Sequence, residues 1–88
     1  MPLPQKDNAS PATLEPSVYL YHAVLGAFRA QGKTFASWCD ANEINRENAR
    51  AALHGLWRGP KASKALERII DGADRETVVF LLKKRKAA

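Results

Sequence analysis

The sequence predicts an all-α fold, in which four to five short helices surround a central pair joined by a tight turn. Helical rather than strand periodicity dominates, because apolar residues recur three and four positions apart in successive stretches. Residues that commonly cap helices precede these stretches, and Gly or Asn follows several of them. With 88 residues, the chain is long enough for one small hydrophobic core and too short for two. We therefore expect a single core and no internal repeats.

The first expected helix spans about residues 17–31. Ser17 is a natural N-cap, and Gly32 is a natural C-terminal stop. Between them, four apolar residues share one helix face: Tyr21, Val24, Leu25 and Phe28. The preceding residues 1–16, MPLPQKDNASPATLEP, are rich in proline and polar residues and lack the apolar middle of a secretory signal. We interpret residues 1–16 as a flexible N-terminal arm.

The central pair begins with a short helix after Thr34, a candidate N-cap, and this helix ends near Asn42, which tolerates the backbone of a tight turn. The next helix runs from Arg46 to about Leu56, with Asn45 as its candidate cap. Helices that cross at a large angle need small residues where their backbones approach. The residues expected at and around this crossing are small or apolar: Trp38, Cys39, Ile44, Ala49, Ala52 and Leu53.

A fourth helix is expected over about residues 61–71. Pro60 suits the first turn of this helix, and Gly72 is expected to stop it. Its inward residues are apolar at helical spacing: Ala65, Leu66, Ile69 and Ile70.

Residues 73–88 allow two conformations. Asp74 and the polar residues after it resemble a helix start, whereas the next apolar residues are good strand formers, and we favour a helix. Packing the whole apolar run inside so small a domain is difficult, and exposing it to water is unfavourable. The run is therefore a candidate homodimer interface: Val78, Val79, Phe80, Leu81 and Leu82. In the alternative, Phe80 or Leu81 covers the first helix of the same chain. The basic tail, residues 83–86, is expected to be exposed and either contacts phosphate or has no role.

Two short helices joined by a turn of three or four residues, between a preceding and a following helix, form the plan of a helix-turn-helix domain. The segment TFASWCDANEINRENARAAL resembles the helix-turn-helix regulators of the lambda-repressor-like class. More loosely, GLWRGPKASKALERII resembles the basic, tryptophan-containing stretch of the phage Ner family. The resemblance covers about residues 20–71, so residues 17–72 form the expected DNA-binding domain. One position departs from the class, because Glu43 stands where the turn usually has Gly. Either Asn42 carries the unusual backbone or the turn geometry differs.

With the small residues inward, helical geometry turns the opposite face of the third helix outward. Arg46 and Arg50, one turn apart, can each reach O6 and N7 of a guanine in the major groove. Asn45 can pair with adenine or serve as the cap, and Ala51 can touch a thymine methyl. Glu47 can accept from cytosine or orient a neighbouring arginine, and we favour orientation. The expected base-contacting residues are Asn45, Arg46, Glu47, Arg50, Ala51 and His54.

The basic residues are concentrated in one acid-free window. No Asp or Glu occurs between Asn48 and Leu66, a stretch that contains several arginines and lysines. Because a carboxylate repels polyphosphate, this gap favours a surface that faces nucleic acid over one that is merely solvated. Side chains at the N-terminal ends of the second and fourth helices are well placed for the DNA backbone. The expected phosphate-contacting residues are Lys33, Thr34, Ser37, Arg58, Lys61, Ser63 and Lys64.

The sequence contains no recognisable catalytic set and no cofactor motif, so neither an enzyme nor a small-molecule substrate is expected. Cys39 is the only cysteine, which excludes an intramolecular disulfide and a multi-cysteine zinc site and suits a reducing setting. His22 and His54 have no accompanying cluster of ligands, so neither predicts a metal site. No apolar stretch approaches the roughly 20 residues that a membrane-spanning helix needs.

The resemblance and the net charge of +5 together predict a cytoplasmic protein of bacterial or phage type that binds double-stranded DNA. The resemblance further implies a transcriptional regulator that represses by covering a promoter and is associated with the nucleoid while bound. Because one reading helix covers only about four to six base pairs, a homodimer on two half-sites is expected. The alternative is an antitoxin-like adaptor whose basic face binds an acidic protein. RNA binding is disfavoured, because no aromatic residue lies on the expected outer face to stack a base.

Overall fold

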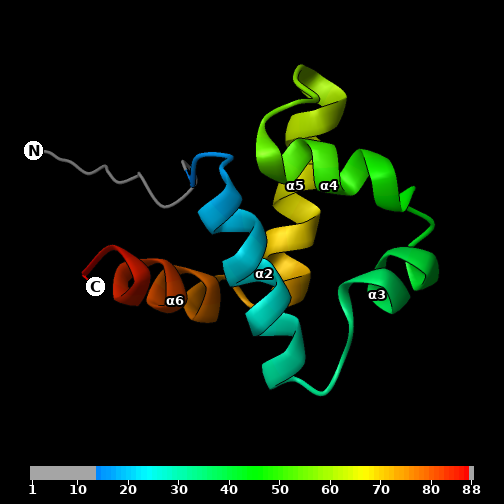
Figure 1. Cartoon of the computed structure of the whole chain (residues 1–88). Helices are drawn as coiled ribbons and strands as arrows, with labels where there is room; N and C mark the ends of the chain where they lie inside the picture. The colour runs from blue at the N-terminus through cyan, green and yellow to red at the C-terminus, as the bar shows by residue number, and fades with distance from the viewer. Residues whose placement is uncertain (1–13, 88) are drawn as a thin grey trace, which may run out of the picture.

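The computed structural model describes residues 14–87 of the chain, and it describes side chains up to Lys84. Within residues 14–87, every regular element is a helix and no strand forms. The helices are α2 (Val18–Ala30), α3 (Phe35–Ala41), α4 (Arg46–His54), α5 (Pro60–Ala73) and α6 (Arg75–Ala87). The predicted all-α fold is therefore confirmed (Figure 1). Most of the predicted N-terminal arm, residues 1–13, lies outside the described residues.

Three helices begin where the sequence predicts, because a polar side chain caps each one. The side-chain oxygens of Ser17, Thr34 and Asn45 accept hydrogen bonds from the backbone amides three residues later, at distances of 3.0, 3.1 and 2.9 Å. Each bond satisfies an amide that has no partner within its own helix. The N-terminus of α5 differs, since Gly59 provides no side-chain cap and Pro60 occupies the first turn.

The turn between α3 and α4 is left-handed at Glu43, the residue that replaces the expected glycine. Glu43 has a φ of 58°, whereas Asn42 has a φ of −103°. Of the two alternatives left open by the sequence, the one in which Asn42 carries the unusual backbone is therefore wrong: Glu43 itself adopts it. The turn is closed by hydrogen bonds from the amides of Glu43 and Ile44 to the carbonyls of Asp40 and Cys39, at 3.2 and 2.9 Å. A left-handed residue with a Cβ costs roughly 1–2 kcal/mol, which these contacts offset.

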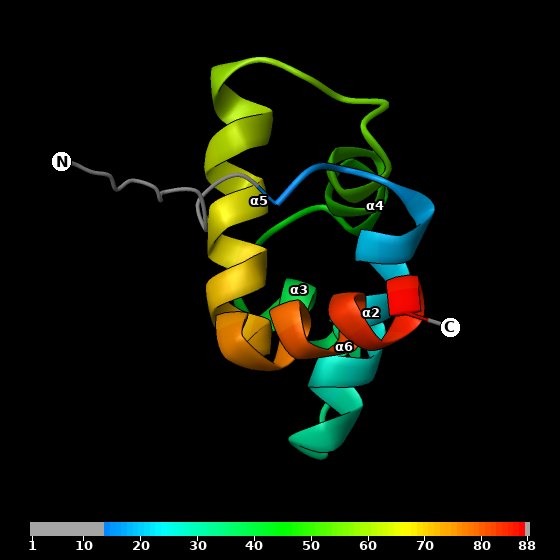
Figure 2. The ribbon, with the colours of Figure 1, turned by 90° about the vertical axis from the view of Figure 1, so that its left-hand side faces the viewer.

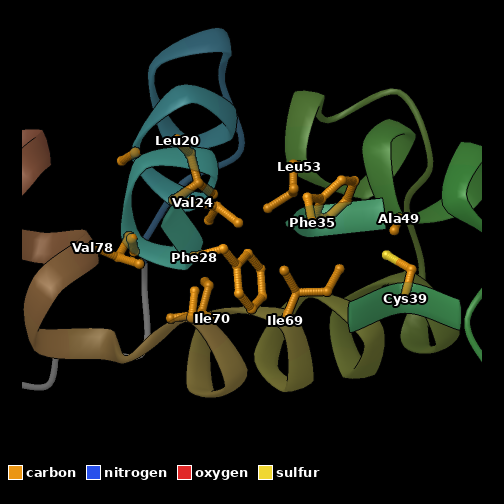
Figure 3. Packing of buried hydrophobic residues seen from close by; sticks show 13 residues of the cluster. Leu20, Val24, Phe28, Phe35, Cys39, Ala49, Leu53, Ile69, Ile70 and Val78 are labelled. Atoms are coloured by element: carbon orange, nitrogen blue, oxygen red, sulfur yellow. The ribbon is translucent and has the colours of Figure 1, made fainter. Parts of the chain in front are cut away.

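The core lies where α2, α4 and α5 meet. Figure 3 shows Val24 and Phe28 of α2 pointing toward Leu53 of α4 and Ile69 of α5. All four side chains are fully buried. Burying aliphatic and aromatic side chains of this size stabilises a fold by about 1.5–3 kcal/mol each, so this contact contributes substantially to stability.

Small residues line the contact between α3 and α4, as predicted. Cys39 and Ala49 are fully buried, Ala52 is almost so, and the sulfur of Cys39 is directed toward Ala49 (Figure 3). Burial raises the pKa of the Cys39 thiol, and the neighbouring Asp40 carboxylate adds to this rise. Because its side chain is fully buried, Cys39 contributes to the packing of α3 against α4.

Gly72 does not stop α5, contrary to the prediction. The helix continues through Gly72 to Ala73, and its C-cap is Asp74, whose φ is 82°. A Cβ on Gly72 would lie 2.5 Å from Cε2 and Cζ2 of the Trp38 indole, so the glycine makes room for that ring. The ring also packs against Phe28, with 5.4 Å between centroids, which places Trp38 at the edge of the core.

The C-terminal segment forms a helix, as we favoured, and this helix, α6 (Arg75–Ala87), packs across α2 (Figures 1 and 2). Val78 is fully buried in the core of the monomer, so its assignment to a dimer interface is wrong. Leu81 lies over Gly26 of α2 and, like Leu82, packs against the core. Phe80 remains 58 % exposed. The apolar run is divided in this way because only one face of α6 contacts α2.

No helix in residues 14–87 is both long enough and apolar enough to cross a membrane.

Candidate nucleic-acid interface

The outer face of α4 carries polar side chains because its inner face is used for packing. Ala49, Ala52 and Leu53 are buried against the rest of the domain. Helical geometry then turns four of the predicted base-contacting residues outward, and all four are exposed: Asn45, Arg46, Glu47 and Arg50. The other two, Ala51 and His54, are half-buried. The predicted set thus lies on one helix face, with its N-terminal part the most accessible.

Helix α4 is two residues shorter than predicted, since it ends at His54. Gly55 follows with a left-handed φ of 83°, and the amides of Leu56 and Trp57 both donate to the carbonyl of Ala51, at 2.8 and 3.2 Å. Leu56 therefore lies beyond the helix and is 83 % exposed. It borders a shallow hollow on the outer face of α4, which Arg50 and His54 also line.

Arg46 is held by a carboxylate from the other helix of the pair. Its Nε donates to Oδ1 of Asp40 at 3.0 Å, and its Nη2 donates to Oδ2 at 2.5 Å. Both side chains are more than half exposed. The hydrogen bond from Arg46 lowers the pKa of the Asp40 carboxyl, and the carboxylate raises the pKa of the Arg46 guanidinium. Because exposed ion pairs contribute little to stability, this contact chiefly determines where the guanidinium lies.

Arg50 and His54 share an aromatic support on α2. The guanidinium carbon of Arg50 lies 5.8 Å from the centroid of the Tyr21 ring, within the range of a cation–π contact. The His54 ring lies 4.7 Å from the same ring, centroid to centroid. Its Nε2 atom is buried without a hydrogen-bond partner. His54 therefore packs against the ring that Arg50 also contacts, whereas we expected it to point outward.

Glu47 does not orient an arginine in the structure. It is exposed, and within residues 14–87 no hydrogen bond or ion pair links its carboxylate to Arg46 or Arg50. The carboxylate that orients Arg46 belongs to Asp40, which the sequence analysis did not single out. Tyr21 was expected only as a core residue. No helical spacing signals either partner, because both contacts join different helices.

The residues expected to contact phosphate are all exposed: Lys33, Thr34, Ser37, Arg58, Lys61, Ser63 and Lys64. At the start of α3, the Thr34 hydroxyl already accepts from the Ser37 amide, and the two hydroxyls bond to each other at 2.9 Å. The N-terminus of α5 has no such cap, but Pro60 carries no N–H and Ala62 is buried, so an anion there would be held mainly by the exposed side chains. Arg58 donates from Nε to the carbonyl of Gly55 at 3.0 Å, which fixes its stem beside the end of α4.

Trp57 is half-buried between α4 and α5. In the part of the chain that the structure describes, no three His, Cys, Asp or Glu side chains gather closely enough to hold a metal ion.

Comparison of the chain with models of protein families, with curated proteins and with solved structures finds no significant match.

Proposed function

We propose that the protein binds double-stranded DNA sequence-specifically through α4 and regulates transcription, as a repressor of bacterial or phage type that covers a promoter at the nucleoid. One observation carries this proposal. Arg46 and Arg50 lie one turn apart on the exposed face of a short helix, and each is supported by a residue from a neighbouring helix. Guanines in the major groove present two acceptors that match an arginine held in this manner.

Support by Asp40 and Tyr21 matters because ordering a long side chain on binding costs about 0.5–1.5 kcal/mol. Arginines already restrained in the free protein lose less conformational entropy when they contact a base. Small inner residues keep α4 close to the domain, and the exposed start of the helix is the end that reads base edges in helix-turn-helix proteins. These features favour base reading over a face that is merely solvated.

Phosphate contacts would come from residues beside the C-terminal end of α4. The loop after α4 and the uncapped start of α5 lie beside its C-terminal end (Figure 1). Lys61 and Lys64 are exposed there, and no acidic residue lies between Asn48 and Leu66. Such contacts supply affinity and register but little sequence preference.

A homodimer would double the number of base pairs read. Val78 is buried, so the dimer surface must consist of other residues. Tyr19 and Phe80 are 47 % and 58 % exposed. Val79 and Leu82 line a groove between the start of α2 and α6. We propose that this apolar surface, formed by Tyr19, Val79, Phe80 and Leu82, contacts a second copy on the adjacent half-site.

The test is binding to duplex DNA across a salt series. A DNA reader releases counterions, so its affinity should fall steeply as salt rises. Arg50→Gln should weaken binding to a selected site more than Arg29→Gln, which removes the same charge from an exposed position on α2. Equal effects of the two variants, or no duplex binding at low salt, would refute the proposal. Binding to an acidic protein instead of DNA would identify an adaptor.

The dimer is tested separately with Phe80→Asp. We expect this variant to bind one half-site as the wild type does and to lose cooperative binding to two half-sites. Unchanged cooperativity, measured by quantitative gel shift, would exclude this surface as the interface.

A further inference from the structure

We infer that Asp40 is a positioning residue for base reading: it holds the Arg46 guanidinium by one edge and leaves the other edge free to bind a guanine. The inference rests on the proposed function and adds to it a residue from outside the reading helix.

The atoms of the pair determine which donors remain. A guanidinium has five N–H groups, one on Nε and two on each Nη. Asp40 accepts from Nε and from Nη2, which together form the side edge of the group. Three N–H groups remain, two on Nη1 and one on Nη2, and the end edge between these nitrogens offers two parallel donors. A guanine presents O6 and N7 side by side, so the end edge suffices for a bidentate contact.

Both ends of the pair are attached to packed backbone. Asp40 directly follows Cys39, which is fully buried, and Arg46 begins α4, whose Ala49 is also fully buried. The pair therefore connects two points that cannot move independently while the core is intact. An arginine without such a partner samples many rotamers in water and must be ordered when it meets a base.

Removing the charge of Asp40 should have opposite effects on general affinity for DNA and on discrimination between bases. A carboxylate close to DNA repels phosphates, so its loss should leave general affinity for DNA unchanged or higher. The same loss releases the Arg46 guanidinium and should weaken discrimination at the base pair that Arg46 reads. A residue that only supports the fold would not separate these two properties. Moreover, an exposed pair of this kind contributes little to folding.

The experiment begins with selection of bound duplexes from a random pool by the wild-type full chain. Affinities are then measured for duplexes that each differ from the preferred site at one base pair. A good bidentate contact corresponds to about 5- to 150-fold discrimination at one position. We expect Asp40→Asn to reduce this discrimination by about two- to fivefold at that position alone, the range for an exposed ion pair. It should bind an unrelated duplex at least as tightly as the wild type. Glu76→Gln, the same charge change on α6, is the control and should leave discrimination unchanged.

Arg46→Ala shows whether Asp40 acts through this arginine. In the Arg46→Ala background, Asp40→Asn should cause no further loss at the same base pair. The inference is overturned if Asp40→Asn discriminates as the wild type at every position, or if its effect persists without Arg46. A wild-type chain that selects no sequence refutes the proposed function and this inference together. A selective wild type that is indifferent to Asp40→Asn refutes the inference alone.

Discussion

Gly72→Ala tests whether the close approach of α5 to Trp38 is a packing requirement. In an ordinary helix interior, replacing Gly with Ala stabilises by up to about 1 kcal/mol through helix propensity. Here the added Cβ would lie 2.5–2.6 Å from three atoms of the indole. The ring cannot withdraw freely, because it already packs against Phe28. Forcing an extra carbon into a packed site costs about 1–3 kcal/mol, so the clash outweighs the propensity gain.

We therefore expect Gly72→Ala to reduce the free energy of unfolding by about 1–2 kcal/mol. Each 1 kcal/mol corresponds to a decrease of about 4–8 °C in the Tm of a domain this small. The assay is urea denaturation followed by far-ultraviolet circular dichroism, with thermal unfolding as a second measure.

Two matched variants make the expectation sharper. Gly26→Ala places a Cβ 3.2 Å from Cδ1 of Leu81, the flexible end of a side chain, so we expect it to be neutral or stabilising. In a Trp38→Ala background the obstacle is gone, and Gly72→Ala should become stabilising by about 0.5–1 kcal/mol. The packing argument is refuted if Gly72→Ala is as stable as the wild type, or if it remains destabilising when Trp38 is absent.

Three further outcomes are expected. Glu43→Gly should increase the free energy of unfolding by about 0.5–1 kcal/mol, because glycine adopts the left-handed backbone of this turn without strain. Chemical denaturation measures this free energy, and a loss of stability would contradict the account of the turn. Asp40 should titrate below its ordinary pKa of 3.8, as followed by carboxyl NMR, and Arg46→Ala should shift the midpoint upward. Since the folded-state pKa is lowered, the stabilisation from this pair is present above pH 3.8 and is lost as the pH falls through the folded-state value. Arg50→Ala should cost specific DNA binding about 1–3 kcal/mol and relax preference at one base pair, whereas Lys61→Ala should weaken all duplexes alike and flatten the salt dependence. Identical salt slopes for wild type and Lys61→Ala would remove Lys61 from the phosphate contacts.

The sequence predicts that the arginines of α4 extend freely from the helix, whereas in the structure each contacts a side chain of another helix. Arg46 is held by Asp40, and Arg50 lies over Tyr21. His54, expected on the outer face, packs on the same tyrosine. Under the proposed function, these contacts restrain the reading side chains before DNA arrives, which lowers the entropic cost of binding.

Helix positions followed from the sequence, because the signals that set them are local. Ser17, Thr34 and Asn45 each bond to an amide three residues away, so a cap can be recognised without knowledge of the rest of the chain. The inward position of Cys39 and Ala49 was likewise predictable from helical periodicity and residue size.

The contacts between helices were decided only by the tertiary structure. Asp40 meets Arg46 across the turn, Trp38 occupies the space above Gly72, and Val78 enters the core rather than an interface. Each of these outcomes depends on how two helices are placed relative to each other, and no repeat or spacing along the chain encodes that placement. Periodicity specifies which face of a helix is buried, whereas packing of the whole domain determines which side chain that face meets.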